Sequence, residues 1–492
     1  MIQAHLPVLQ VLIAMVAAPL CVLLHHGRIA GLLSVAVSWA SLAVAVMLLL
    51  QVLSSGVVTY EFGGWAAPYG IEYRIDILNS FVLLIVAAIG AMVIPYSLRS
   101  AADEVPPERQ WLFYALVNLL LAGLFGVAIT GDIFNAFVFL EISSLSSYAL
   151  VSLGRNPRAL TSAFRYLVLG TLGATFILIG IGFLYAATGT LNMADLGERV
   201  QGQLGSRTIL VAFAFLTVGI SLKAALFPLH WWLPGAYAYA PSAVTALLAS
   251  TTTKVAIYLL LRLVFLFGPA FVYAELPMSE IIVSLALLGI LAGSAAALFQ
   301  NDIKRLLAYS SIAHVGYMLL GIGIGGALGL TGGIVHMFNH ALAKSALFLA
   351  IGCVVLRVGS SGLSDIQGMG RRMPWTIAAF VVAGLSLIGV PLTAGFVGKW
   401  YLVLAALERG WWWVAATLLL SGALSVIYIW RVVEKAYFHD PKPGSAEAVE
   451  APLSMLVPLW ALAGASLYFG INTSINAGIA AQAAAAVLRI VP

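Results

Sequence analysis

The sequence predicts an all-α polytopic membrane protein with about fourteen transmembrane helices. Hydrophobic residues make up 62% of its 492 residues and charged residues only 9%, and the mean hydropathy is +1.04. A soluble domain of this length needs far more polar surface. The apolar segments run to about twenty residues, as membrane-spanning helices do, whereas the strands of a membrane barrel alternate over about ten.

The predicted spans follow one another without a soluble domain between them. The first has no basic segment before it and no small-residue cleavage site, so we expect a retained span and not a removed signal peptide. The last is long enough to divide in two. The predicted ranges are 6–24, 29–53, 77–98, 110–130, 133–153, 160–187, 207–234, 241–267, 280–299, 303–323, 328–356, 375–407, 411–435 and 452–488. The longest polar pieces are 54–76, 188–206 and 438–452.

Basic residues in the connecting loops predict the orientation. The loops after odd-numbered spans, with the adjoining span ends, carry fourteen: Arg28, Arg99, Arg109, Arg155, Arg158, Arg165, Lys304, Arg305, Arg357, Arg371, Arg372, Arg431, Lys435 and Lys442. The opposite side carries six: Arg74, Arg199, Arg207, Arg262, Arg409 and Arg489. Because cytoplasmic loops are rich in Lys and Arg, the first side is expected to be cytoplasmic. An even number of spans then places both termini outside the inner (plasma) membrane.

The remaining four basic residues are lysines inside spans: Lys223, Lys254, Lys344 and Lys399. No arginine is predicted at mid-span. A buried lysine can release its proton near neutral pH, whereas arginine essentially never does. Charges that served only as static contacts would have little reason to exclude arginine. This pattern therefore indicates groups that bind and release protons.

Glu141 is the only acid predicted at mid-span, about 12 Å into its helix. Its expected partner is Lys223, which is followed after five residues by a helix-breaking proline, Pro228. A lysine beside a helix break resembles the discontinuous-helix sites of transporters. The alternatives are a structural ion pair for Glu141 and a kinked helix with a snorkelling lysine for Lys223.

A second long span repeats these features, with Pro391 ahead of Lys399. Two broken helices in corresponding positions indicate internal repeats. Lys254 lies centrally in its span after Thr251, Thr252 and Thr253, whose hydroxyls could hold water near the lysine or bond back to their own helix.

His336, His340 and Lys344 recur at i, i+4 and i+8, which predicts a polar stripe about 12 Å long on one helix face. We interpret the stripe as a proton wire, with a satisfied structural stripe as the alternative. A metal site is disfavoured because no nearby Cys, Asp or Glu completes a ligand set. His314 in the preceding span could serve either packing or proton relay.

The segments "QNDIKRLLAYSSIAHVGY", "HMFNHALAKSALF" and "GDIFNAFVFLE", with Lys223 and Pro228, resemble the antiporter-like family. That family comprises the proton-translocating membrane subunits of respiratory complex I, membrane-bound hydrogenases and Mrp-type multisubunit Na⁺/H⁺ antiporters. The resemblance covers about residues 70–440. Within the family, "TGDIFNAFVF", "WWLPGAYAYAPSAVTALLAS" and the chain length are most similar to the D-type subunits of Mrp antiporters.

The resemblance implies fourteen helices with two inverted five-helix repeats and breaks in the seventh and twelfth. The expected divisions are helices 1–3 (1–109), the first repeat (110–267), the second repeat (280–435) and a C-terminal helix (452–492). It also implies that Glu141 pairs with Lys223, that Lys254, His336, His340 and Lys344 link two half-channels, and that Lys399 faces the exit. Many relatives have a lysine where this chain has Arg165, and because arginine does not titrate, a relay role at that position is disfavoured.

The expected function is that of a proton-translocating subunit of a multisubunit antiporter that exchanges a monovalent cation, Na⁺, for H⁺. Its expected partners are other membrane subunits and the lipid bilayer. Cys21 and Cys353 lie apart in apolar runs, so no zinc, haem or iron–sulfur cofactor is expected. Scattered basic residues disfavour nucleic-acid binding. The alternatives are a proton-pumping subunit of a redox enzyme such as complex I or a hydrogenase, and a structural scaffold.

Overall fold

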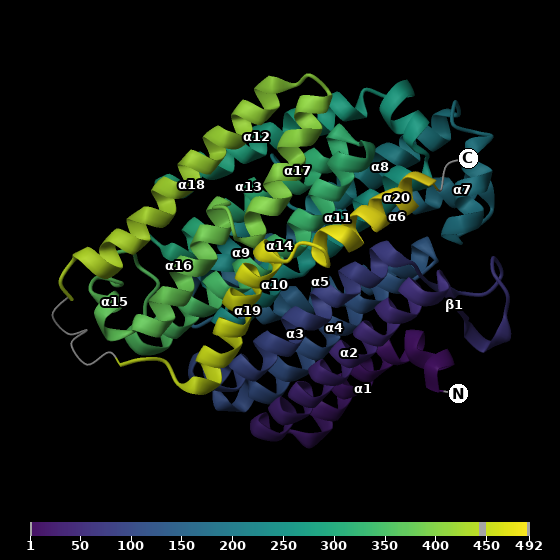
Figure 1. The fold of residues 1–492 in the computed structure, drawn as a ribbon. Coiled ribbons are helices and arrows are strands. Elements are labelled where there is room, and N and C mark those ends of the chain that lie inside the picture. The colour runs from purple at the N-terminus through teal and green to yellow at the C-terminus, as the bar shows by residue number, and fades with distance from the viewer. Residues whose placement is uncertain (1, 442–448, 490–492) are drawn as a thin grey trace.

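The computed structural model describes residues 2–441 and 449–489, and helices account for nearly all of it (Figure 1). In these residues twelve helices are long and apolar enough to cross a membrane, which confirms the predicted fold class. They are α1 (Leu6–Leu24), α2 (Gly27–Ser55), α3 (Ile77–Glu104), α4 (Gln110–Ile129), α5 (Ile133–Ser152), α6 (Arg158–Thr188), α10 (Ser242–Ser250) continuing into α11 (Thr252–Leu266), α12 (Met278–Leu298), α13 (Ile303–Ile324), α14 (Gly326–Val358), α18 (Trp412–Phe438) and α19 (Leu453–Ile471).

The two predicted spans outside this set are the ones in which a break is predicted. In the first, α8 (Arg207–Lys223) is separated from α9 (Leu233–Tyr239) by turns that contain Pro228. In the second, α16 (Pro374–Ile388) is separated from α17 (Ala394–Glu408) by a segment that contains Pro391. A proline cannot donate a backbone hydrogen bond and so favours an interruption of the helix, as predicted for both segments.

The remaining elements are shorter. They are the helices α7 (Met193–Gln201), α15 (Met369–Arg372) and α20 (Asn476–Arg489) and the single turns η1 (Ile2–His5), η2 (Phe62–Gly64), η3 (Pro107–Arg109) and η4 (Phe271–Glu275). The last predicted span is divided between α19 and α20. Within the polar piece 54–76, β1 (Val58–Glu61) pairs antiparallel with β2 (Glu72–Ile75), and this hairpin projects from the bundle (Figure 1).

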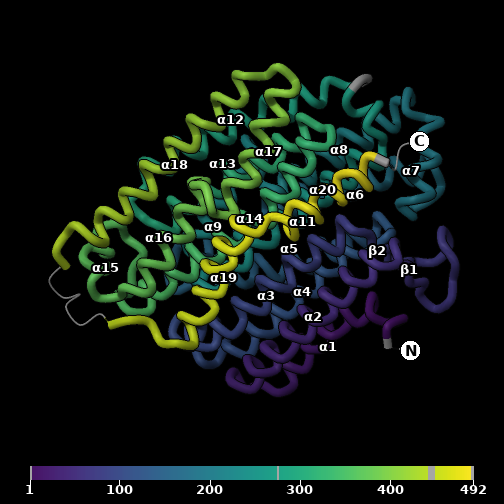
Figure 2. Tube along the Cα trace, in the orientation of Figure 1, coloured from purple at the N-terminus to yellow at the C-terminus, as the bar shows by residue number. Residues whose placement is uncertain are grey.

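The helix α14 forms the centre of the molecule. Every residue from Gly329 to Val354 is buried. Helices α3, α10, α13, α16, α17, α19 and α20 all pack against it, and the tube trace shows it enclosed by them (Figure 2). A charged side chain within this stretch, such as that of Lys344, is therefore surrounded by protein and not by lipid.

The turn η1 and the C-terminal end of α20 lie at the same end of the bundle (Figure 1). The predicted loop 438–452 lies only partly in the described residues, and Lys442 lies outside them.

The hairpin of β1 and β2 is not predicted from the sequence. Its two strands have four residues each, and an alternation of apolar and polar residues over so short a length cannot be distinguished from a loop sequence.

Candidate functional site

The first part of the site is an ion pair between α5 and α8. Lys223 Nζ lies 2.7 Å from Glu141 Oε1, and it also donates to Ser144 Oγ at 2.8 Å and Tyr148 Oη at 3.3 Å. Glu141, Ser144 and Tyr148 are spaced i, i+3 and i+7, so they share one face of α5. The Lys223 side chain is 5% exposed and that of Glu141 is 23% exposed. The ammonium is therefore held by one charge and two hydroxyls.

The break after α8 places Lys223 at the end of a half-helix. Lys223 is the last residue of α8, and Ala225 adopts a positive φ of 57°. The indole of Trp232 donates to the carbonyl of Leu222 at 3.0 Å, and this carbonyl also accepts from the backbone N of Ala225 at 3.2 Å. Trp232 in turn stacks on Tyr166 of α6 with ring centroids 4.0 Å apart. The break is thus a packed feature of the fold.

Lys254 is fully buried at a distortion in the next span. The distortion falls at Thr251, between α10 and α11, and the Lys254 ammonium donates to the carbonyl of Ala249. The hydroxyls of Thr251 and Thr252 bond back to their own helix, whereas Thr253 Oγ1 lies 3.4 Å from Lys254 Nζ. Thr251 and Thr252 therefore bond back to their own helix, whereas Thr253 contacts the lysine.

Three histidines form one cluster between α13 and α14. His314 Nδ1 lies 3.0 Å from His336 Nε2, and the His314 ring centroid is 4.8 Å from that of His340. Neither ring nitrogen of His340, nor Nδ1 of His336, has a hydrogen-bond partner among the described residues. Buried polar atoms in this state normally bond to water. His314, whose role is open from the sequence, joins the two histidines of the stripe.

Lys344 is fully buried, but its ammonium hydrogen-bonds to α13 and not to His340. Its ammonium donates to the carbonyl of Leu307 at 2.7 Å and to Ser310 Oγ. The expected stripe on α14 is therefore only part of the arrangement, because the lysine turns toward the neighbouring helix. A lysine side chain is long enough to reach either His340 on its own helix or the neighbouring α13, and the packing of the helices determines which of them it contacts.

Lys399 lies on α17 and is held by the preceding half-helix. Its ammonium donates to the carbonyls of Leu387 at 3.0 Å and Ile388 at 2.8 Å, the last two residues of α16. It also lies 5.0 Å from the ring centroid of Tyr317. The Tyr317 ring is 5.2 Å from that of His336. Tyr317, the last residue of the segment "QNDIKRLLAYSSIAHVGY" but not one of the predicted site residues, therefore lies between Lys399 and the histidine cluster.

The structure thus brings the predicted site residues into two groups. Glu141 and Lys223 form one, and the histidine cluster with Tyr317 and Lys399 forms the other. Lys254 and Lys344 are buried on helices next to these groups. Arg165 is exposed on the outside of α6 and has no hydrogen-bond partner among the described residues. The described residues contain no cluster of three or more His, Cys, Asp or Glu that could hold a metal ion.

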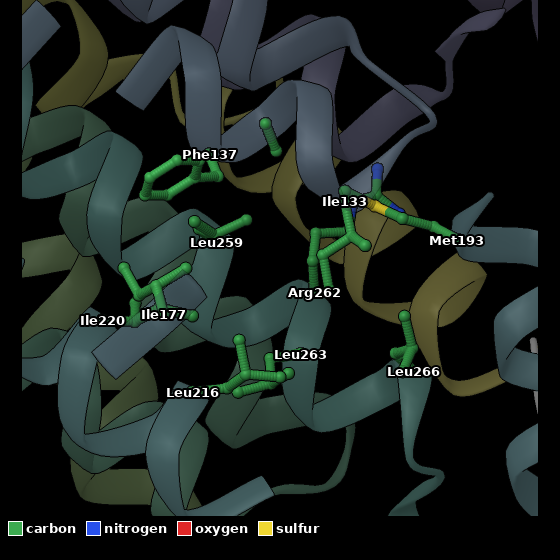
Figure 3. A pocket seen from close by; sticks show the side chains of 11 residues that line it. Ile133, Phe137, Ile177, Met193, Leu216, Ile220, Leu259, Arg262, Leu263 and Leu266 are labelled. Carbon is green, nitrogen blue, oxygen red and sulfur yellow. The ribbon is translucent and has the colours of Figure 1, made fainter. Parts of the chain in front are cut away.

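A small cavity of about 20 Å³ lies between α5, α6, α8 and α11 (Figure 3). Its walls are aliphatic and aromatic apart from Arg262, whose guanidinium pairs with Asp76. Binding sites for polar ligands need several convergent polar groups. This cavity therefore lacks the polar groups of a site for a polar ligand.

A family model described as NADH:quinone oxidoreductase/Mrp antiporter, TM, matches residues 130–425. The chain belongs to this family. All of the site residues from Glu141 to Lys399 fall inside the matched segment. The resemblance seen in the sequence is confirmed, and the chain is a polytopic membrane protein.

Members of both branches of the family are similar over nearly the full chain. The N subunit of the NADH-quinone oxidoreductase of Desulforudis audaxviator is 42% identical over 475 residues, covering 93% of this chain and 94% of the relative. The D-type subunit of the Na⁺/H⁺ antiporter of Bacillus subtilis is 31% identical over 488 residues, covering 98% and 97%. A chain of the Mrp complex from Dietzia sp. matches with a TM-score of 0.89 and 26% identity, covering 99% of this chain and 98% of that chain.

Proposed function

We propose that this chain is the proton-translocating subunit of a multisubunit antiporter that exchanges Na⁺ for H⁺. The observation that carries the proposal is the Glu141–Lys223 pair beside a helix break, together with the buried Lys254 and Lys344, the half-buried Lys399 and a histidine cluster. Ionisable side chains inside the membrane are costly and mark ion pathways by default. The full-length similarity to the D-type subunit of the Bacillus subtilis Na⁺/H⁺ antiporter supports the same assignment.

Glu141 is the only mid-span acid, whereas Lys223, Lys254, Lys344 and Lys399 are four mid-span lysines. One carboxylate cannot balance four positive charges at once. An ammonium without a counter-ion is unfavourable in a dry interior, and it can become neutral by passing on its proton. Protons would move from Lys223 through Lys254 and Lys344 to the histidines and then to Lys399, with water bridging the gaps. The Glu141 carboxylate would retain the proton on Lys223 until a neighbouring charge changes.

The histidine cluster suits the middle of such a path. A neutral imidazole carries one donor and one acceptor nitrogen, so the His314–His336 contact can pass a proton in either direction. The unpartnered nitrogens of His336 and His340 leave positions for water on both sides. Tyr317 extends the polar contacts to Lys399, which lies at the second helix break.

We also propose the division into two repeats, 110–267 and 280–435, between helices 1–3 (1–109) and a C-terminal segment (452–492). Supporting this, α5 and α13 begin with the same local structure. Each has an aspartate at its N-cap, Asp132 or Asp302, that bonds the backbone three residues on. Two backbone hydrogen bonds also join the start of each helix to the loop after the next helix. For α5 they run from Ile133 N to Leu191 O and from Met193 N to Gly131 O. For α13 they run from Ile303 N to Ser361 O and from Leu363 N to Asn301 O.

The charge distribution supports a cytoplasmic position for the end rich in Lys and Arg and an outer position for both termini. A subunit with a partly exposed Glu141 and an exposed Arg165 on the outside of α6 is expected to work beside other membrane subunits, in line with the Mrp complex that it resembles. The first repeat's outer face would then contact protein instead of lipid.

The test is purification of the intact complex with identification of its partners, followed by reconstitution into proteoliposomes. We expect a Na⁺ gradient to drive H⁺ movement, and the Lys223→Ala variant to assemble but not transport. Transport by that variant at the normal rate would reject the proposal.

The second candidate is the proton-pumping membrane subunit of a redox complex of the NADH:quinone oxidoreductase type. It is favoured by the higher identity, 42%, to a relative with that name. The proton path within this chain would be the same. Iron–sulfur partners in the purified complex would support this candidate, whereas small membrane subunits alone would support the antiporter.

A further inference from the structure

A further buried ion pair, Glu104–Lys304, lies at the end of the bundle that carries most of the basic loop residues. Glu104 ends α3, and its side chain is 11% exposed. Its Oε1 accepts from Ser100 Oγ at 2.6 Å, and its Oε2 accepts from the backbone N and Oγ of Ser242 at 2.9 and 3.0 Å. Glu104 therefore caps the start of α10, the helix that leads to Lys254.

Lys304 completes the pair from the first turn of α13. Its Nζ lies 4.0 Å from Glu104 Oε2 and donates to the carbonyl of Ala240 at 3.3 Å, where α9 ends. The side chain is only 5% exposed. From the sequence, Lys304 is one of the ordinary basic residues of the cytoplasmic loops, so its burial is a finding of the structure.

One side of α13 connects this pair to the proposed proton path. Lys304 is followed at intervals of three, three and four residues by Leu307, Ser310 and His314, so consecutive members are neighbours on the helix surface. Leu307 O and Ser310 Oγ hold the ammonium of Lys344, and His314 contacts His336. The rise from Lys304 to His314 is about 15 Å.

We infer that Glu104 and Lys304 form the proton-uptake site through which water at this end of the bundle supplies Lys344 and the histidine cluster. The inference rests on the proposed function, and it identifies the side from which protons reach this part of the path. Glu104 is the more exposed of the two side chains and Lys344 is fully buried, so accessibility falls in the order in which the groups would act.

The transfers balance without any change of oxidation state. A hydronium ion gives a proton to the Glu104 carboxylate, which becomes a carboxylic acid. The Lys304 ammonium gives a proton through a bridging water to the neutral amine of Lys344. The neutral Lys304 amine then takes the proton from Glu104, which returns to a carboxylate.

The alternative is a static clamp that holds the ends of α9 and α10 together. Arginine would serve that role as well as lysine, because it stays charged and offers more donors. Lys304 has three donor hydrogens but makes one hydrogen bond within the described residues, to Ala240, which leaves capacity for water. The same preference for lysine over arginine marks the four lysines inside the spans.

The experiment measures H⁺ transport by the assembled complex in everted vesicles, in H₂O and in D₂O. The variants are Lys304→Arg, which keeps the charge but cannot release it, and Glu104→Gln, which keeps an acceptor for Ser242. We expect each to assemble normally and to lose at least fivefold in rate, with a larger isotope effect because proton uptake becomes limiting. The matched control is Arg305→Gln, an exposed neighbour, which should transport normally with an unchanged isotope effect.

Normal transport by Lys304→Arg with an unchanged isotope effect would overturn the inference in favour of the clamp. Failure of both variants to assemble would overturn it too, because the pair would then be structural. Glu141→Gln is measured alongside. If Glu141→Gln is inactive while Lys304→Arg is normal, only this inference fails, whereas an active Glu141→Gln contradicts the proposed function itself.

Discussion

Lys223 and Glu141 meet across α5 and α8, with Nζ 2.7 Å from Oε1, at the point where α8 ends. Because Lys223 lies at the end of a half-helix, its position depends on the break as well as on the acid. The same ammonium contacts Ser144 and Tyr148 on the face of α5 that carries Glu141. The Lys223 ammonium can therefore leave the Glu141 carboxylate and remain bonded to the hydroxyls of Ser144 and Tyr148 on the same helix.

Glu141→Gln should abolish ion-coupled transport while the protein still inserts and assembles. The amide can still accept a hydrogen bond from Lys223 but supplies no counter-charge. Removing one partner of a buried ion pair leaves the other uncompensated, at about 3–5 kcal/mol. The double variant Glu141→Gln/Lys223→Met should therefore be expressed better than Glu141→Gln alone and remain inactive. Dye-monitored H⁺ transport in everted vesicles, normalised to the amount of assembled protein, provides the measurement.

Lys254→Arg should fail nearly as badly as Lys254→Ala. The site is fully buried and its ammonium is held by the carbonyl of Ala249, so a guanidinium would keep a charge there permanently. If the lysine only balanced charge, the arginine variant would work. Proton uptake is measured for both variants at equal expression, and an active arginine form contradicts a titrating role for Lys254.

The histidine cluster should be most sensitive at the contact between helices. His314→Leu and His336→Leu each remove one side of a 3.0 Å contact, and we expect at least a tenfold loss of transport from either. Glutamine can hold water but cannot titrate, so His336→Gln should be intermediate if the ring orders water and inactive if it must be protonated. His340→Leu tests the remaining member of the cluster. Full activity in all three leucine variants would show that the cluster only packs.

The predictable part of the site comes from residues that are rare in their surroundings. Glu141, Lys223, Lys254, Lys344 and Lys399 stand out because a charge inside an apolar span is costly, and prolines next to two of them indicate where helices are interrupted. These signals depend on position along the chain alone. They locate charged residues correctly without information about neighbouring helices.

The contacts that depend on packing could not be predicted. Nothing in the local sequence shows that Lys344 reaches Leu307 and not His340, because both lie within the range of a flexible side chain. Glu104 lies in the loop predicted after the span 77–98, and Lys304 lies at the start of the predicted span 303–323. Charges are ordinary at both places, so the sequence gives no sign of their burial against each other. Ser144 and Tyr148 could have been found, since they follow Glu141 at helical spacing.

The close approach of α17 to α14 gives the last prediction. A Cβ added at Gly398 would lie 2.9 Å from Cα, Cβ and Nδ1 of His336, so Gly398→Ala has to push the two helices apart. Overpacking of this kind costs about 1–3 kcal/mol. The displacement should also move the adjacent Lys399 away from Tyr317 and the histidine cluster, and we expect transport to fall severalfold with assembly retained. The control is Gly464→Ala on α19, where nothing lies within 4 Å of an added Cβ and alanine favours the helix. Equal transport by the two alanine variants would show that the spacing between α17 and α14 does not limit proton movement.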